Sequence, residues 1–402
     1  KLFPIAMPQL CVQSGQSAAN KDIPRIMGRD LDLSGYFEVL DPNAYIETPG
    51  KCVGPDKGAY SDWSVIGAEG LVRGIVEARP DGRLRVQLFL HDVQRQSVVL
   101  GKEYEGDESQ IPRMAHKFAN EIMKFFTGEP GVFGSQIAFS SRVGRFKELF
   151  VMDMDGSNVR QLTNEKGLAV SPAWDPQGRT LVYTSYRNRV PDLYLIDVAT
   201  RHIQQLTRGD ALEIGAHFSA QGGKILASSM QGRESNIVLI NPDGSIYRRI
   251  TSSTINIDTS PNWSPDNSKI VFVSNRAGGP QIYVMNADGS DARRISFVSS
   301  NYCTSPAWSP KGDKIAFVCR ADSGFQLFVS NADGSGPMQL TSMGDNEDPD
   351  WSPDGRYLVF ATTFGRGMGF NLALMRSDGT NTRQLTQSRG GDFEPAWGPM
   401  PQ

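Results

Sequence analysis

Histidine and serine often carry acid–base and nucleophilic chemistry, so their spacing is the first indication of an enzyme. The histidines of this chain, His91, His116, His202 and His217, are scattered. No serine lies in a Gly-x-Ser-x-Gly nucleophile motif, and no phosphate loop, dinucleotide fingerprint or His-rich metal motif is present. The sequence therefore predicts a non-enzymatic binding protein, with His116 as a structural or surface histidine.

Carboxylates recur just before a series of short apolar runs. They are Asp210, Glu213, Asp258, Asp345, Glu347, Asp348, Asp392 and Glu394. If those runs are the innermost strands of a ring, the carboxylates converge around one mouth of a central channel. Such a mouth would attract a cation or a basic partner segment. The alternative is that these are ordinary solvated loop carboxylates. Arg187, Arg276 and Arg320 are expected on the same face, where they would moderate the field.

The run Asp153 to Gly156 resembles the start of a calcium-binding loop. Its glycine comes too early, however, and Leu162 stands where the loop needs a glutamate. Asp-Gly recurs at equivalent places near residues 243, 288, 333 and 378. Hairpin turns favour these residues because they tolerate positive φ. We therefore interpret the motif as a structural turn.

Four cysteines, Cys11, Cys52, Cys303 and Cys319, are divided two and two between the N-terminal region and the repeats. No C-x-x-C pair is present, which disfavours a zinc ribbon. If the strands around the turn at residues 310–313 pair, Cys303 and Cys319 face each other and could form a disulfide. An even count favours disulfides and an oxidising compartment. Four buried free thiols remain the alternative.

A repeat of about 45 residues occupies most of the chain, and each unit carries strand-like runs bounded by turn residues. Its anchor aromatics are Trp174, Phe218, Trp263, Trp308, Trp351 and Trp397. Its unit ends are Leu162-Thr163, Leu206-Thr207, Ile250-Thr251, Ile295-Ser296, Leu340-Thr341 and Leu385-Thr386. This pattern predicts a six-bladed β-propeller over residues 132–402.

The two ends of the array predict how the ring closes. The first unit, residues 136–163, lacks a Trp-bearing strand, whereas such a strand ends the chain at residues 394–398. The C-terminal strand should therefore complete the first blade and remove both sheet edges.

Residues 1–131 show no repeat and predict a separate α/β domain, a mixed sheet with two helices on one face. One helix is expected over residues 22–34, stopped by Gly35. The other should run from an N-cap at Ser109 to Phe126, with a buried stripe that includes Met114 and Phe125.

Composition limits the class of partner. The net charge of −3 provides no electrostatic case for nucleic acid. No run of about 18 apolar residues is present, so no membrane span is predicted. The first residue is Lys1, which we interpret as a processed or truncated N-terminus, with a signal peptide removed upstream.

Two sets of motifs, one in each region, match a known protein family. In the N-terminal region the matching residues include Asp30-Leu31, Asp62-Trp63, Leu90-His91-Asp92-Val93 and Thr127-Gly128-Glu129. In the array they are the Trp-Ser-Pro-Asp-Gly repeats and Pro395-Ala396-Trp397. In these residues the chain resembles the TolB family of the Tol–Pal system. The resemblance implies a periplasmic, monomeric, non-catalytic protein without a cofactor, whereas the mouth carboxylates leave a channel cation as an alternative. Its implied partners are the lipoprotein Pal at the propeller mouth, TolA at the N-terminal side, colicins and other outer-membrane-associated proteins. Its implied role is outer-membrane integrity during cell division.

The same resemblance implies which residues bind Pal, just before the inner strands. They are Glu213, Ile214, Gly215, Asp258, Thr259, Thr304, Ser305, Glu347, Asp348 and Glu394. Leu212 and Gly215 depart from the family pattern, and the family's N-terminal extension toward TolA is missing upstream of Lys1. The alternative function is a propeller domain of a peptidase-related, ligand-binding or cation-binding protein.

Overall fold

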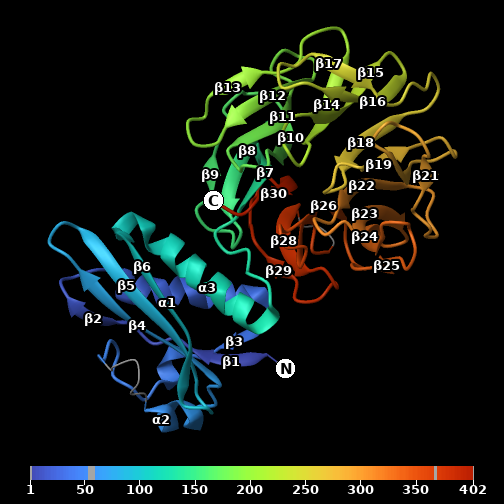
Figure 1. Ribbon diagram of the computed structural model, residues 1–402. Helices are drawn as coiled ribbons and strands as arrows, with labels where there is room; N and C mark the ends of the chain where they lie inside the picture. Colours follow the sequence, from blue (N-terminus) through green and yellow to red (C-terminus); the bar gives the residue numbers. More distant parts are fainter. Residues whose placement is uncertain (1, 53–58, 366–368, 402) are drawn as a thin grey trace. The chain divides into compact units, whose positions relative to one another are not determined.

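The computed structural model describes residues 2–52, 59–365 and 369–401. The chain folds into two compact units, Lys1–Gly134 and Ser135–Gln402 (Figure 1). The sequence placed this boundary after Gly131. We describe each unit by itself.

The N-terminal unit is built on a mixed sheet of order β3-β1-β4-β5-β6, with β2 also paired to β4. Its strands are β1 (Phe3–Ala6), β2 (Cys11–Ser14), β3 (Phe37–Val39), β4 (Gly70–Ala78), β5 (Arg83–Asp92) and β6 (Ser97–Asp107). The first three run parallel to their neighbours, and β4, β5 and β6 form antiparallel hairpins. In β5, every second residue from Leu84 to Leu90 is buried, which produces the alternation seen in the sequence.

Helices α1 (Ala19–Ser34) and α3 (Ile111–Thr127) pack against each other beside the sheet (Figure 1). As expected, Gly35 ends α1 in the left-handed conformation, with φ 71°. Met114, Phe118 and Ile122 form the buried stripe of α3. Phe125 was predicted to join that stripe but is 50% exposed.

The cap predicted for the second helix was wrong. Ser109 is not a helix cap, because it lies inside a 3-10 turn, η2 (Glu108–Gln110), that Asp107 caps by accepting the Ser109 backbone N–H. A short helix that the sequence did not indicate, α2 (Tyr60–Val65), forms around the buried Trp63. A second 3-10 turn, η1 (Pro42–Ala44), precedes α2 in the chain. Such short helices lack the repeated apolar spacing that reveals longer ones.

Six four-stranded sheets form the propeller within the described residues, so the expected fold is confirmed (Figure 1). The first sheet holds β30 (Asp392–Trp397), β7 (Gln136–Val143), β8 (Phe146–Asp153) and β9 (Arg160–Gln161). The second and third hold β10 (Ala169–Trp174), β11 (Thr180–Ser185), β12 (Asp192–Asp197), β13 (Ile203–Gln205), β14 (Leu212–Phe218), β15 (Ile225–Gln231), β16 (Glu234–Ile240) and β17 (Ile246–Arg249). The fourth and fifth hold β18 (Asp258–Trp263), β19 (Lys269–Ser274), β20 (Gln281–Asn286), β21 (Arg293–Arg294), β22 (Cys303–Trp308), β23 (Lys314–Ala321), β24 (Gly324–Asn331) and β25 (Met338–Gln339). The sixth holds β26 (Asn346–Trp351), β27 (Tyr357–Thr362), β28 (Asn371–Arg376) and β29 (Arg383–Gln384).

Ring closure occurs through β30, which pairs antiparallel with β7 as the missing innermost strand of the first sheet. Each outermost strand is short, two to four residues, so little sheet edge is presented to solvent. The Asp-Gly motif is a turn here: Asp155 accepts the Ser157 N–H, and Gly156 has φ 83°.

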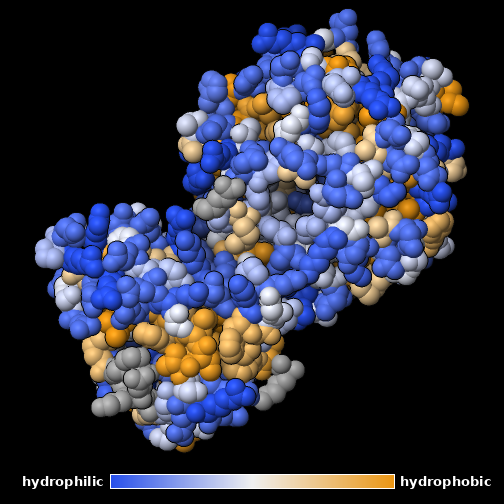
Figure 2. Space-filling view, viewed as in Figure 1, coloured by the Kyte–Doolittle hydropathy of each residue, from blue (hydrophilic) through white to orange (hydrophobic). Residues whose placement is uncertain are grey.

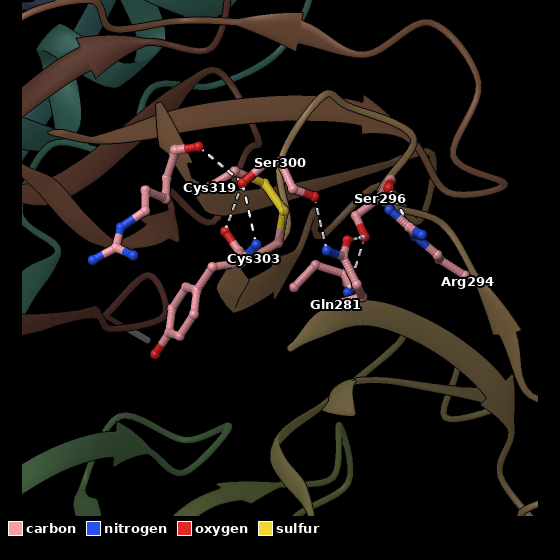
Figure 3. The surroundings of a disulfide bond; sticks show 9 residues. Gln281, Arg294, Ser296, Ser300, Cys303 and Cys319 are labelled. Carbon is pink, nitrogen blue, oxygen red and sulfur yellow. Dashed lines mark hydrogen bonds between the residues drawn. A yellow bond between two sulfur atoms is a disulfide. The ribbon is translucent and has the colours of Figure 1, made fainter. Parts of the chain in front are cut away.

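Both cysteine pairs form disulfides, Cys11–Cys52 in the N-terminal unit and Cys303–Cys319 in the propeller. Cys303 and Cys319 are direct register partners of β22 and β23, as the turn-based pairing predicted. Figure 3 shows that this disulfide lies beside a hydrogen-bonded loop, in which Ser300 donates to the Arg320 carbonyl and Gln281 of β20 donates to the Ser300 carbonyl. The fourth and fifth blades are therefore tied together at the start of β22.

Candidate functional site

A β-bulge interrupts the innermost strand of all six blades. The regular pairing breaks between the second and the fifth residue of the six-residue stretch that ends at the anchor aromatic. The residue at each bulge has φ between 48° and 61°. These six bulge residues are Ser171, Gly215, Ser260, Ser305, Asp348 and Glu394. Five of them are not glycine, and the left-handed conformation costs such residues about 1–2 kcal/mol each. Strain of this kind clusters at functional sites, and bulges re-aim side chains.

The bulge residues line a pocket of about 150 Å³ together with the residues that follow them. A proline comes next in five blades and Ala216 in the sixth. Because the six strands surround the propeller axis, the pocket lies in the central channel. Figure 2 shows the propeller hollowed at its centre.

Hydrogen bonds hold the bulges across blade boundaries. The Ser171 hydroxyl and backbone N–H both donate to the carboxylate of Glu394, at 3.1 and 3.0 Å. The Ser305 hydroxyl donates to Asp348 at 2.8 Å. The Gly215 N–H donates to a threonine hydroxyl of the preceding blade in the same manner. The strained ring is thus a preorganised surface rather than a loose rim.

Three carboxylates and one ammonium group set the electrostatics of the mouth. Burial and then the charge of Glu394 raise the pKa of Asp348. Burial and then the charge of Asp345 raise the pKa of Glu347. The Lys147 ammonium, 4.0 Å from the centre of the Phe393 ring, opposes both shifts. A cationic group of a partner would stabilise the ionised forms of these carboxyl groups.

Deeper in the channel lie Asp350, His217 and Asn262, two positions after the bulge in their blades. Burial raises the pKa of Asp350 to about 7, although the backbone N–H groups of Trp397 and Trp351 donate to its carboxylate. Burial lowers the pKa of His217 to about 4. Both side chains therefore favour their neutral forms, as expected for polar groups in a largely enclosed channel.

Asp350 should make the stability of the propeller depend on pH. Its pKa is about 7 in the folded chain and near 4 in the unfolded chain, so the folded state retains a proton that the unfolded state releases. The resulting stabilisation is complete below about pH 4 and is lost as pH rises toward 7. Asp350 is only partly buried, so we expect a loss of roughly 2 kcal/mol. Urea denaturation at about pH 5 and about pH 7.5 should show this loss, and Asp350→Asn should reduce it.

Asp243→Asn provides the matched control, because hydrogen bonds from Ser245 lower the pKa of this exposed turn residue and keep its titration outside the window. His217 acts in the opposite direction: its lowered pKa removes stability as pH falls below about 6.5. It is present in every variant, so its effect cancels in the comparison. Equal pH dependence in the parent chain and Asp350→Asn would contradict the raised pKa of Asp350.

The ten residues predicted to bind a partner lie within the first half of the innermost strands, not before them. Gly215, Ser305, Asp348 and Glu394 line the channel pocket. Ile214, Thr259, Thr304 and Glu347 are half-buried neighbours of the bulges. Two of the ten are buried: Glu213 accepts a hydrogen bond from Ser229, and Asp258 forms an ion pair with Arg276. These two carboxylates position the strands, since their charged atoms are directed into the protein.

Other charged residues that were expected at the mouth also make their contacts within the protein. Arg187 bonds to Glu165, whose side chain is 1% exposed. Asp345 accepts the Phe325 backbone N–H, and Asp392 is buried. Arg320 lies 5.7 Å from the centre of the Phe325 ring.

The sequence interpretation missed Asp350, His217 and Asn262, although their shared position, one residue before the anchor aromatic, was a usable signal.

Exposed apolar side chains surround this mouth. They lie in the segments that enter the innermost strands or follow the second strands: Val143, Leu168, Val190, Ile255, Ile257, Phe297, Tyr302, Met343 and Phe364. In the described part of the propeller, the other large exposed hydrophobics lie at the outermost strands: Val159, Ile246, Tyr247 and Met338. Apolar surface gathered around a polar centre is typical of a protein-binding site.

Neither a membrane-spanning helix nor a metal-ion cluster is present among the described residues. No helix among them is long and apolar enough to cross a membrane. No group of three or more His, Cys, Asp or Glu side chains is arranged to hold a metal ion in residues 2–52, 59–365 and 369–401.

Comparison with known proteins agrees with this architecture. The Tol-Pal system protein TolB of Jannaschia sp. (strain CCS1) is 37% identical over 188 residues, which cover 46% of this chain and 42% of that protein. The TolB of Paramagnetospirillum magneticum is also 37% identical, over 191 residues with the same coverage. These matches thus span less than half the length of the curated relatives. The crystal structure of TolB from Acinetobacter baumannii superposes with a TM-score of 0.85 at 25% identity, covering 99% of this chain and 97% of that one.

Two family matches follow the order of the two units, although the propeller match begins at residue 123, within α3. Residues 1–99 match the TolB amino-terminal domain. Residues 123–401 match the TolB beta propeller domain, which is well over half of the 402 residues. The chain therefore belongs to the TolB family.

Proposed function

We propose that this chain is a non-enzymatic scaffold of the Tol–Pal system and that its propeller mouth binds the lipoprotein Pal. The observation that carries the proposal is the ring of six bulge residues, five of them strained, encircled by exposed apolar side chains. Bulge strain preorganises the polar centre, and the apolar rim supplies the surface that association would bury. The carboxylates Glu347, Asp348 and Glu394 suit a partner that brings a basic group.

A second surface supports contact with TolA through the N-terminal unit. Leu2, Phe125 and Phe126 are 46%, 50% and 39% exposed. The rings of Phe3 and Phe37 pack against Phe126 at 4.5 and 5.3 Å between centroids. Figure 2 shows apolar side chains gathered on this unit. An exposed aromatic cluster of this kind is a candidate protein-interaction site.

The two disulfides support the periplasm as the compartment, since such bonds persist in oxidising surroundings. The proposed role there is to maintain outer-membrane integrity during cell division, as a monomer without a cofactor. The same mouth would be available to colicins during their import.

Isothermal titration calorimetry with the soluble domain of Pal tests the proposal directly. We expect saturable binding at one Pal per chain. A parallel titration with purified TolA tests the second surface independently. Absence of heat and of co-elution with Pal would overturn the assignment of the mouth.

A further inference from the structure

The N-terminal unit contains a cavity of about 490 Å³ that the proposed function does not use. This volume is within the range of small-molecule binding sites. One wall is a face of α1, a second is the β1–β2 connection, and the third is β3 with the segment after it. The lining residues are Met7, Pro8, Gln9, Lys21, Pro24, Arg25, Gly28, Val39, Pro42, Tyr45, Glu47 and Pro49.

The sequence of α1 explains why the space is not filled. Lys21, Pro24, Arg25 and Gly28 occupy one helical face, which carries two exposed charged residues, a proline and a glycine instead of large apolar side chains. Pro24 has no backbone N–H, and the Asn20 carbonyl that it leaves free accepts the N–H of Leu10 at 2.9 Å. The helix is therefore well anchored although this face contributes little packing.

Gly28 forms an open part of the wall. A Cβ placed there would lie 3.6 Å from the Met7 side chain and 3.7 Å from that of Val39, which is ordinary contact. The other walls are mostly apolar, with Gln9 and Glu47 as their polar residues. Tyr45 contributes its ring, because its hydroxyl already donates to the Leu40 carbonyl and accepts the Met7 N–H.

The charged groups at the cavity that are not held in a buried ion pair are positive. Glu47 is the acidic lining residue, and Arg73 binds its carboxylate with two hydrogen bonds of 3.1 and 2.7 Å. Both side chains of that pair are less than 10% exposed. Lys21 is exposed at the rim, and Arg25 forms an exposed ion pair with Asp22, which is worth little and is readily exchanged. The cavity thus combines apolar walls with two cations that can accept an anionic head group.

We propose that this cavity binds a single-chain amphiphile with an anionic head group, such as a fatty acid or a lysophospholipid. The acyl chain would lie against Met7, Val39 and the face of Gly28. The carboxylate or phosphate would pair with Lys21 and Arg25. Both ligands share this chemistry, so the experiment must distinguish them.

Calorimetry of the whole chain with dodecanoate and with 1-lauroyl-lysophosphatidate, each below its micelle concentration, tests the proposal. We expect one saturable site for at least one of the two, and the tighter ligand identifies the natural class. Dodecyltrimethylammonium, which has the same chain and a cationic head, should bind at least about ten-fold more weakly. Gly28→Leu should fill the cavity and weaken binding about ten-fold or more, whereas Gly28→Ala should leave it within about three-fold.

Lys21→Glu keeps the test decisive if Gly28→Leu does not fold, because Lys21 is exposed. This change should weaken binding of the anionic ligands about five-fold or more and leave the circular dichroism spectrum unchanged. The proposal is overturned if neither anionic ligand binds, if the cationic amphiphile binds equally well, or if Lys21→Glu has no effect.

Discussion

Replacing Thr259 by tryptophan is expected to weaken the affinity for Pal about ten-fold or more, which corresponds to at least about 1.4 kcal/mol of binding free energy. Thr259 is half-buried in β18 and directly precedes the bulge residue Ser260. An indole there would occupy space that an entering partner segment needs. Tryptophan is favoured in strands, so the free energy of unfolding should change by no more than about 1 kcal/mol. Calorimetry with Pal and thermal denaturation measure the two effects.

Val159→Trp provides the matched control, since Val159 is 52% exposed and directly precedes β9, an outermost strand. It introduces the same side chain away from the mouth and should leave the affinity within about two-fold. Glu347→Trp places the bulk in another blade and should act like Thr259→Trp. If both mouth variants bind Pal as the parent chain does, the mouth is not the Pal site.

Replacing Trp397 by alanine should have the largest effect on stability, about 3–5 kcal/mol of the free energy of unfolding. Trp397 is 7% exposed, and its indole N–H donates to the Ser135 hydroxyl at 2.9 Å. Its backbone N–H donates to Asp350 at 2.7 Å, and its ring stacks on Tyr357. Because β30 closes the ring, loss of this anchor loosens the contact between the first and last blades. Calorimetric melting should fall by roughly 10 °C.

Two variants show whether that loss comes from ring closure. Trp397→Phe retains an aromatic ring against Tyr357 but loses the bond to Ser135, so its melting temperature should lie between those of the parent chain and Trp397→Ala. Phe297→Ala removes an aromatic side chain that is 60% exposed and should change stability by less than about 0.5 kcal/mol. A Trp397→Ala protein that melts like the parent chain would show that β30 is held by other contacts.

Local patterns revealed the propeller because every blade repeats the same chemistry. Short apolar runs, Asp-Gly turns and an aromatic every 45 residues or so are properties of neighbouring residues, and they survive in a single sequence. The register of Cys303 and Cys319 followed from one turn, because pairing across a hairpin is determined by its loop. The helices of the N-terminal unit were less certain at their ends, where Asp107 rather than Ser109 provides the cap.

The candidate site was only partly visible in the sequence. Glu394 and Ser171 are 223 residues apart, and their hydrogen bonds exist only after the ring has closed. The sequence analysis also predicted the same binding role for all mouth carboxylates, although Asp258 is buried against Arg276 and Asp348 faces the channel. Their difference arises from the bulge, which shifts the alternation of side chains along each innermost strand.

The sequence by itself determined the class of the protein: a small α/β unit followed by six repeated blades, closed by the C-terminal strand around Trp397. Only the tertiary structure decided which side chains face the channel and which are committed inside the blades. The physical reason is that repeats, turns and caps depend on residues close in the chain, whereas burial, strain and pKa values depend on groups brought together from distant blades.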